Sequence, residues 1–315
     1  MTQRTLFPIL LVGLPIGLAV SIVVAVYLYY NPLDIPLPSR PKREDVRTLL
    51  RRSPNEGDLR DYRRILTTDL AVSRDGQNPD VPAATANWIA STLGPSNLGL
   101  EVRFMESEES AGRQSNQTLV VEIPGTRQKN DVILLATGYR SSTAEIDDAV
   151  ATAALMSVAG AFTGAPQRRT LLIAFLPGET PDDRGLTPLD AVVQAAQLRS
   201  QSVRGILDLR VGRPPAPESS APALQARVVA VAPRDDQPWT TEVREAFAPR
   251  KPAGLPLEFV TTSEVPPQAM VLGGWRSSPA PYLLLWLFPA AGNHEGSPLA
   301  LAQSLEGVLQ TLANQ

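Results

Sequence analysis

Four carboxylates and one histidine are spaced so that they could hold a divalent metal ion or act as a general base. Asp147 and Asp148 open an expected helix, and Glu179 comes directly after an apolar segment. Asp208 lies near the end of another apolar segment, and His294 follows the last one. Carboxylate oxygens and imidazole nitrogens are zinc ligands, and a glutamate can remove a proton from water. Each residue also has a purely structural interpretation, since acidic residues favour helix N-termini and single histidines are common in loops.

The elements that must position these residues follow a pattern of short apolar segments alternating with helical ones. Continuous apolar strands separated by helices predict an α/β fold, a three-layer sandwich with a mainly parallel, mixed central sheet. In such open sheets ligands bind beyond the carboxyl ends of the strands, so we expect the residues above to converge there. The expected strands are 100–104, 118–123, 132–136, 171–176, 205–209, 228–231 and 283–288. The expected helices are 58–72, 83–93, 147–162, 188–199, 239–247 and 298–312.

Composition excludes several classes of function. The chain has no cysteine and a single histidine, which rules out thiolate chemistry and any scheme that needs two histidines. A net charge of −3 gives no basic surplus, so no nucleic-acid partner is expected. The sequence contains neither a Gly-x-Ser-x-Gly elbow nor a Gly-x-x-x-x-Gly-Lys phosphate loop.

Four segments, in this order, resemble a known family. They are Asn116-Gln-Thr-Leu-Val-Val-Glu-Ile-Pro-Gly-Thr126, Val132-Ile-Leu-Leu-Ala-Thr-Gly-Tyr-Arg-Ser-Ser142, Glu145-Ile-Asp-Asp148 and Leu171-Leu-Ile-Ala-Phe-Leu-Pro-Gly-Glu-Thr180. Their layout is similar to that of the aminopeptidase S and Y type of di-zinc exopeptidase, peptidase family M twenty-eight. The resemblance covers about residues 58–315 and implies that family's three-layer fold.

The resemblance also implies a site in which most zinc ligands have been replaced. The family's first zinc histidine falls on Gly138, and the carboxylate two residues later falls on Arg140. The bridging aspartate and the general-base glutamate fall on Asp148 and Glu179, which keep those residue types. The other positions are Thr180 for a zinc glutamate, Leu209 for the aspartate of a Leu-Asp-Met-x-Gly strand, and His294 for the final histidine.

Too few ligands survive for a two-zinc centre. Zinc in an enzyme needs about three protein ligands and one open position. Asp148 and His294 are vestigial ligands in this interpretation, and Glu179 is a vestigial base. Asp208 could serve only if it slipped by one position from the Leu209 match, which in a strand turns a side chain to the other face. Arg140 could instead pair with Asp148 or Glu179 and fill the vacated site.

The leading hypothesis is therefore a pseudoenzyme: a catalytically inactive, peptidase-like domain that acts in binding or complex assembly and needs no cofactor. Family members without zinc ligands have such roles, so the resemblance implies a protein or peptide partner. The alternative is an active zinc metallopeptidase that uses a shifted ligand set of Asp148, Glu179, Asp208 and His294. A third interpretation is a structural envelope protein with an unrelated α/β fold.

The N-terminal region has the pattern of a single-pass transmembrane helix. Residues 6–30 contain no charged side chain, and a helix of that length spans a hydrocarbon core of about 30 Å. Tyr27, Tyr29 and Tyr30 lie at one end, where aromatic residues mark the membrane interface. The run is too long, and too poor in preceding basic residues, for a cleaved signal peptide. We expect an uncleaved membrane anchor.

These features predict four parts: a tail (1–5), the anchor (6–30), a proline-rich and charged linker (31–57) and the peptidase-like domain (58–315). We expect the domain to be extracytoplasmic. The count of basic residues is against this, because Arg4 precedes the span while Arg40, Lys42, Arg43 and Arg47 follow it. Long domains, however, are translocated largely regardless of such charges.

Overall fold

A computed structural model describes residues 20–21, 51–71, 80–105, 117–140, 147–178, 186–212, 227–232, 238–248, 257–261, 281–288 and 296–315. The chain divides into Met1–Lys42 and Arg43–Gln315, and the first unit is described only at Val20 and Ser21, which are helical. Within the described ranges no helix combines the length and apolar content needed to cross a membrane. The expected anchor otherwise lies outside these ranges and stays a prediction.

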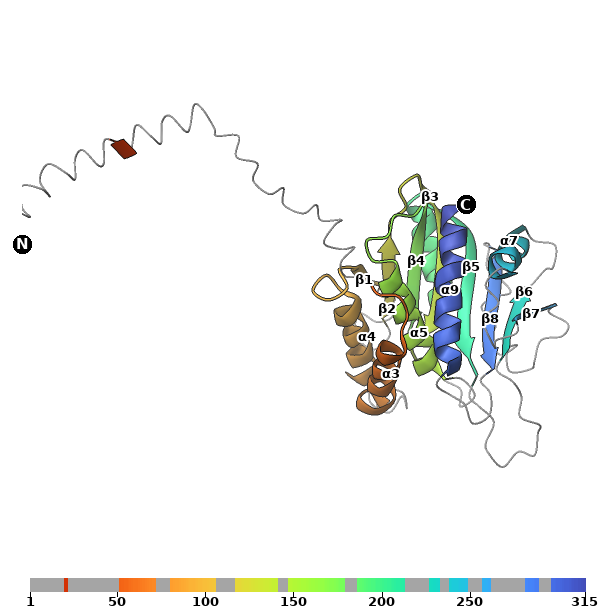
Figure 1. Cartoon of the computed structure of the whole chain (residues 1–315), viewed down its shortest axis with the longest axis horizontal. Helices are drawn as coiled ribbons and strands as arrows, with labels where there is room; N and C mark the ends of the chain where they lie inside the picture. Colours follow the sequence, from red (N-terminus) through yellow and green to blue (C-terminus); the bar gives the residue numbers. More distant parts are fainter. Residues whose placement is uncertain are drawn as a thin grey trace, which may run out of the picture. The chain divides into compact units, whose positions relative to one another are not determined.

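The second unit is built on an eight-stranded mixed sheet with the order β1-β2-β4-β3-β5-β8-β6-β7 (Figure 1). The central pairs β4–β3, β3–β5 and β5–β8 are parallel, and antiparallel pairs lie on either side of them. The strands are β1 (Glu101–Met105), β2 (Thr118–Ile123), β3 (Gln128–Gly138), β4 (Arg169–Leu176), β5 (Ser202–Val211), β6 (Arg227–Ala232), β7 (Leu257–Thr261) and β8 (Tyr282–Phe288).

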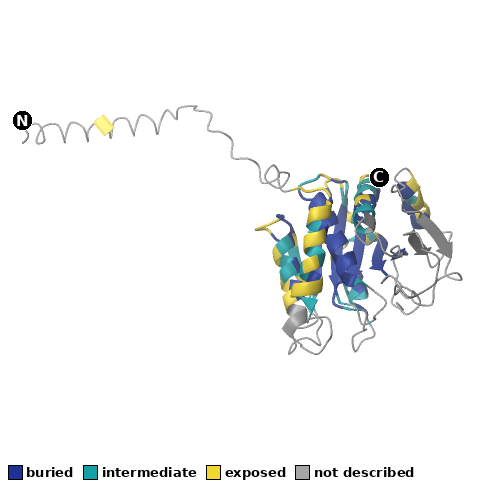
Figure 2. Cartoon of the chain, turned by 60° about the horizontal axis from the view of Figure 1, so that its bottom comes forward, coloured by how far each residue is buried: buried dark blue, intermediate teal, exposed yellow. Residues whose placement is uncertain are grey.

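Helices cover both faces of this sheet and enclose two separate cores. The larger core receives apolar side chains from α3, α4, α5, α7 and α9, and the smaller core on the opposite face receives them from α6. Buried residues fill the central strands and α5, while exposed residues lie along α3 and α4 (Figure 2). The helices are α3 (Glu56–Arg64), α4 (Asp80–Leu93), α5 (Asp148–Ala161), α6 (Pro188–Leu198), α7 (Pro238–Phe247) and α9 (Gly296–Asn314).

The central helix α5 is buried at every residue. Alanine and glycine are frequent along it, and these small side chains let neighbouring elements approach from all sides. It contacts α9 and α3 as well as β3 and β5. The chain before α3 also packs on it, since the backbone N–H of Arg52 donates to the carbonyl of Gly160 at 3.3 Å.

The observed elements agree with most of the expected ones. Strand β2 has the predicted bounds, and the predicted 147–162 and 188–199 helices are α5 and α6 with ends shifted by a residue. The expected helix 58–72 instead becomes α3 followed by a π-helical turn, Ile65–Asp69. Strand β7 was not anticipated. The predicted architecture is confirmed as a mixed α/β sheet with helices on both faces.

Candidate functional site

The start of α5 is fixed to the carboxyl ends of two central strands. Asp147 caps the helix, because its side chain accepts from the backbone N–H of Val150 at 3.3 Å. The backbone N–H of Asp147 donates to the carbonyl of Val211 in β5 at 2.7 Å. Thr152, one turn into the helix, donates from its hydroxyl to the carbonyl of Gly138 in β3 at 3.1 Å. The structural interpretation of Asp147 is therefore correct, and Asp148 is left as the first helical carboxylate, 2% exposed.

Gly138 ends β3 at the position that the resemblance gives to the first zinc histidine. A Cβ built on Gly138 would lie 2.9 Å from Nη1 of Arg210 and 3.5 Å from Oδ1 of Asp148. Both groups therefore point at the space where a histidine side chain would begin. The cation in that space comes from β5, and sequence reasoning missed it.

Arg210 is held there by Asp208, two residues earlier on the same strand face. Nε of Arg210 donates to Oδ1 of Asp208 at 2.9 Å, and Nη2 donates to Oδ2 at 3.2 Å. The hydroxyl of Tyr282, on the neighbouring strand β8, donates to Oδ2 at 2.6 Å. All three residues are buried, with 2–4% exposure. A bidentate guanidinium–carboxylate pair of this kind fixes the orientation of both side chains.

The register of the sheet shows which predicted residues meet. Asp208 pairs with Ala136 across β3 and β5, so its side chain lies on the same face as the Gly138 position. Leu209 lies on the opposite face, fully buried in the larger core. The structure thus brings Gly138, Asp148 and Asp208 together around Arg210, and it separates Leu209 from them. Glu179, Thr180 and His294 lie outside the described residues.

The described residues do not fit a zinc ion. Gly138 offers no donor atom, both oxygens of Asp208 accept hydrogen bonds from Arg210, and a guanidinium lies beside Asp148. Among the described residues no group of three or more histidine, aspartate or glutamate side chains is placed to hold a metal. Asp148 and Asp208 are donors of the right type, but Asp208 is already paired with Arg210.

The residues after Gly138 extend the site along the end of β3. Tyr139 is 2% exposed, and its hydroxyl donates to the carbonyl of Gln117 at 2.9 Å. Burial raises the pKa of this phenol, and the positive charge of Arg140 partly lowers it. Arg140 itself is half-buried. The pairing of Arg140 with Asp148 or Glu179 stays a prediction, because Glu179 is outside the described residues.

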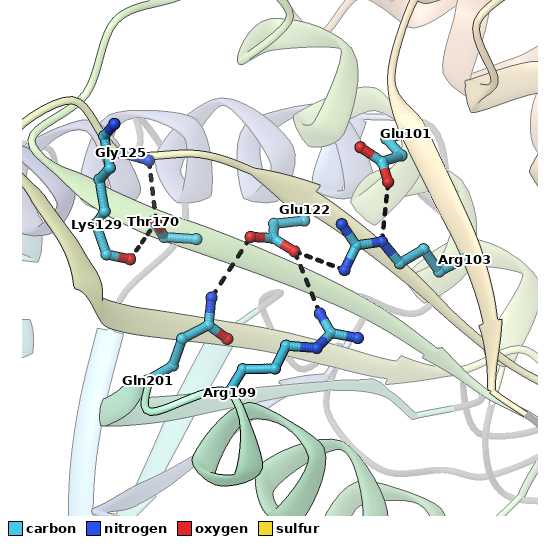
Figure 3. Close-up of polar contacts among 8 residues, drawn as sticks. All are labelled: Glu101, Arg103, Glu122, Gly125, Lys129, Thr170, Arg199 and Gln201. Atoms are coloured by element: carbon cyan, nitrogen blue, oxygen red, sulfur yellow. Dashed lines mark hydrogen bonds and ion pairs between the residues drawn. The ribbon is translucent and has the colours of Figure 1, made fainter.

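A second polar cluster lies at the other end of the sheet, around Glu122 on β2 (Figure 3). Its carboxylate meets Arg103 of β1 at 3.1 Å and Arg199 at 3.4 Å, and it accepts from Gln201 at 3.4 Å. Arg103 also contacts Glu101 at 2.9 Å. The side chains of both arginines are more than a third exposed. This cluster is therefore a surface network that links β1 and the end of α6 to β2.

Comparison with solved structures identifies the fold. The chain is similar to the aminopeptidase LapA of Legionella pneumophila, with a TM-score of 0.58 and 13% identity over 89% of this chain and 79% of that one. It is similar to a putative zinc-dependent exopeptidase of Bacteroides vulgatus, with a TM-score of 0.51 and 11% identity over 83% and 98%. A glutaminyl cyclase of Tannerella forsythia gives 0.51 and 12% over 83% and 97%.

These likenesses establish a shared fold at low sequence identity. No family model matches the sequence, and no curated protein matches it at the sequence level. The resemblance read from the motifs is confirmed in the fold: the sheet and its helices have the arrangement of the zinc exopeptidases. The interpretation as an unrelated α/β fold was wrong.

Proposed function

We propose that this chain is a membrane-anchored, catalytically inactive peptidase-like protein whose domain binds a protein or peptide partner. One observation supports the loss of catalysis: Nη1 of Arg210 lies 2.9 Å from the Cβ position of Gly138, the residue to which the resemblance assigns the first zinc histidine. Asp208 is engaged by the same guanidinium through both carboxylate oxygens. A fold with the layout of a hydrolase then remains as a scaffold for binding.

Electrostatics favours this proposal over a shifted zinc site. Two unit charges 4 Å apart repel by about 4 kcal/mol at an effective dielectric of 20, and a divalent ion doubles that to about 8 kcal/mol. A zinc ion near Gly138 would meet this repulsion from Arg210. It would also have to displace Arg210 from Asp208, which would leave a guanidinium buried without its carboxylate. A metallopeptidase that uses Asp208 as a ligand would therefore need Arg210 to leave the site.

Metal content and peptidase activity test the proposal together. Full-length protein, purified in detergent and dialysed against buffer with added zinc, is analysed for metal and assayed on aminoacyl reporter substrates. A zinc aminopeptidase prepared in parallel is the positive control, and the variant Glu179→Gln is the matched negative control. We expect far less than one zinc per chain, and the same background rate for the wild type and the variant. Zinc near one or two per chain, with activity lost in Glu179→Gln, would establish the metallopeptidase instead.

Anchoring and topology need their own test. The proposal places residues 6–30 in the membrane on the basis of their uncharged apolar run. It places the domain on the extracytoplasmic side, against the count of basic residues, because long domains are translocated largely regardless of such charges. Sealed membrane vesicles of known orientation, treated with protease, report the side. We expect an alkali-resistant membrane protein whose domain is digested only when the extracytoplasmic face is accessible. Release by alkali would exclude an anchor, and digestion from the cytoplasmic face alone would reverse the topology.

A further inference from the structure

Three charged side chains are buried together at the carboxyl ends of β3 and β5. Asp148 and Asp208 are each 2% exposed, and Arg210 is 4% exposed. Removing a charged group from water costs several kcal/mol unless a partner compensates it. A domain that keeps these three charges inside must therefore have an arrangement that offsets the cost.

The guanidinium of Arg210 binds Asp208 with one edge and turns its remaining nitrogen toward the Gly138 position, which Asp148 also approaches. One edge, Nε and Nη2, forms the two bonds to Asp208. The remaining nitrogen, Nη1, lies 2.9 Å from the Cβ position of Gly138, and Oδ1 of Asp148 lies 3.5 Å from the same point. Arginine suits this task, because its planar fork has donors on two edges and its charge persists at every ordinary pH.

The N-terminus of α5 and the hydroxyl of Tyr282 further stabilise the two buried carboxylates. Asp148 is the first residue of α5, where the partial positive charge of a helix N-terminus stabilises a carboxylate. The Tyr282 hydroxyl adds a third hydrogen bond to Asp208. Among the described residues, Asp208 is thus compensated by the charge of Arg210 and the hydroxyl of Tyr282, and Asp148 by the helix N-terminus and the nearby Nη1 of Arg210.

We propose that Arg210 is a built-in cation that takes the charge-compensating place of a divalent metal ion at this site. It holds the ends of β3 and β5 and the start of α5 in register, so the domain folds without a metal. The inference goes beyond the proposed loss of activity, because it assigns a structural role to what replaced the metal centre. It also explains why Gly138 has no side chain: a Cβ there would collide with the guanidinium.

Thermal unfolding of the full-length chain, with and without a chelator, tests the role. Arg210→Met removes the charge but keeps an unbranched apolar side chain, and Arg210→Lys keeps the charge but loses the fork. The matched control is Arg204→Met on the same strand, where Arg204 meets Asp131 at 2.9 Å and is 54% exposed. We expect Arg210→Met to lower Tm by about 6–20 °C and Arg204→Met by at most about 3 °C. Arg210→Lys should fall between the wild type and Arg210→Met, and chelator should not change the Tm of the wild type.

The paired variant Asp208→Asn, Arg210→Met separates charge from packing. If Arg210 compensates charge, removing both partners restores part of the lost Tm, or restores folding where Arg210→Met alone yields no folded protein. The inference is overturned if Arg210→Met is no less stable than Arg204→Met, or if the paired variant is as unstable as Arg210→Met. A wild type that loses stability in chelator would also overturn it. Zinc binding with peptidase activity is a separate outcome, which refutes the proposed function and leaves these Tm comparisons to stand on their own.

Discussion

Replacing Gly138 by alanine is the smallest change that probes the site. The new methyl would lie 2.9 Å from Nη1 of Arg210, closer than Cβ atoms are found in proteins, so one of the two must move. The end of an arginine side chain is ordinarily flexible and would yield at little cost. Here two bonds to Asp208 fix it, and the methyl can be accommodated only if those bonds lengthen.

Two opposing contributions set the expected magnitude. A hydrogen bond between charged groups contributes about 1.5–3 kcal/mol, and the displacement of Arg210 weakens two of them. Against this, alanine restricts the unfolded chain and contributes about 0.4–1 kcal/mol of stability where the backbone permits it. Gly138 does not have a positive φ, so the backbone does permit it. The loss is the larger contribution, and Gly138→Ala should destabilise the protein by about 1–2 kcal/mol.

Urea unfolding followed by tryptophan fluorescence measures this difference, because urea is uncharged and does not screen the ion pair. Gly178→Ala is the control: no atom of the described residues lies within 4 Å of its Cβ position, so that variant should be as stable as the wild type or slightly more stable. In an Arg210→Met background the cost of Gly138→Ala should disappear, since the group it displaces is gone. If Gly138→Ala behaves like Gly178→Ala in the wild-type background, the guanidinium is not held as described.

Two further predictions concern packing and pH. Gly205→Ala should cost about 3 kcal/mol in the same assay, because its Cβ would fall on the Trp239 ring, which is 3% exposed and has no room to retreat; a neutral result, equal to that of Gly178→Ala, would contradict it. Tyr139 should stay protonated at pH 11, since burial raises the pKa of its phenol. A group with a raised folded-state pKa supports the fold below the unfolded value and loses that contribution as pH rises through the folded value. Burial also raises the pKa of Tyr62, so ultraviolet titration should show one more phenol that ionises only with unfolding in the wild type than in Tyr139→Phe. Coincident titration curves would refute the assignment.

Much of the fold could be predicted because its elements have strong local signals. Apolar runs define the central strands, and β2 was predicted at its observed ends, Thr118–Ile123. Strand β3 begins four residues earlier than predicted, with the polar segment Gln128–Asp131, because pairing of Gln128 with Arg169 adds polar residues to the sheet. Strand β7 was not singled out, although β1, which is also a five-residue strand at an edge of the sheet, was predicted within one residue.

The site was harder to predict than the sheet, because its main residue was not sought. The motif drew attention to the missing ligands and to Arg140, whereas the cation that the described contacts place at the Gly138 position is Arg210. The signal was present: Asp208 and Arg210 are two residues apart in a strand, which places both side chains on one face. The match to the Leu-Asp-Met-x-Gly strand also directed attention to Leu209, which lies in the core on the opposite face of the sheet. Tyr282 had no local signal, since it meets Asp208 only through the pairing of β5 with β8.

The complete enclosure of α5 limits how this protein can diverge. A helix with an outward side can accept lysine, glutamate or glutamine there at almost no cost, and such exchanges accumulate freely. Every residue from Asp148 to Ala161 is surrounded by protein, so each enlargement presses on a neighbouring element and each new polar group must find a partner inside. Drift along this helix is confined to swaps among residues of small volume. Relatives whose sequences are too distant to align elsewhere should therefore still show the same sequence of small side-chain volumes along this helix.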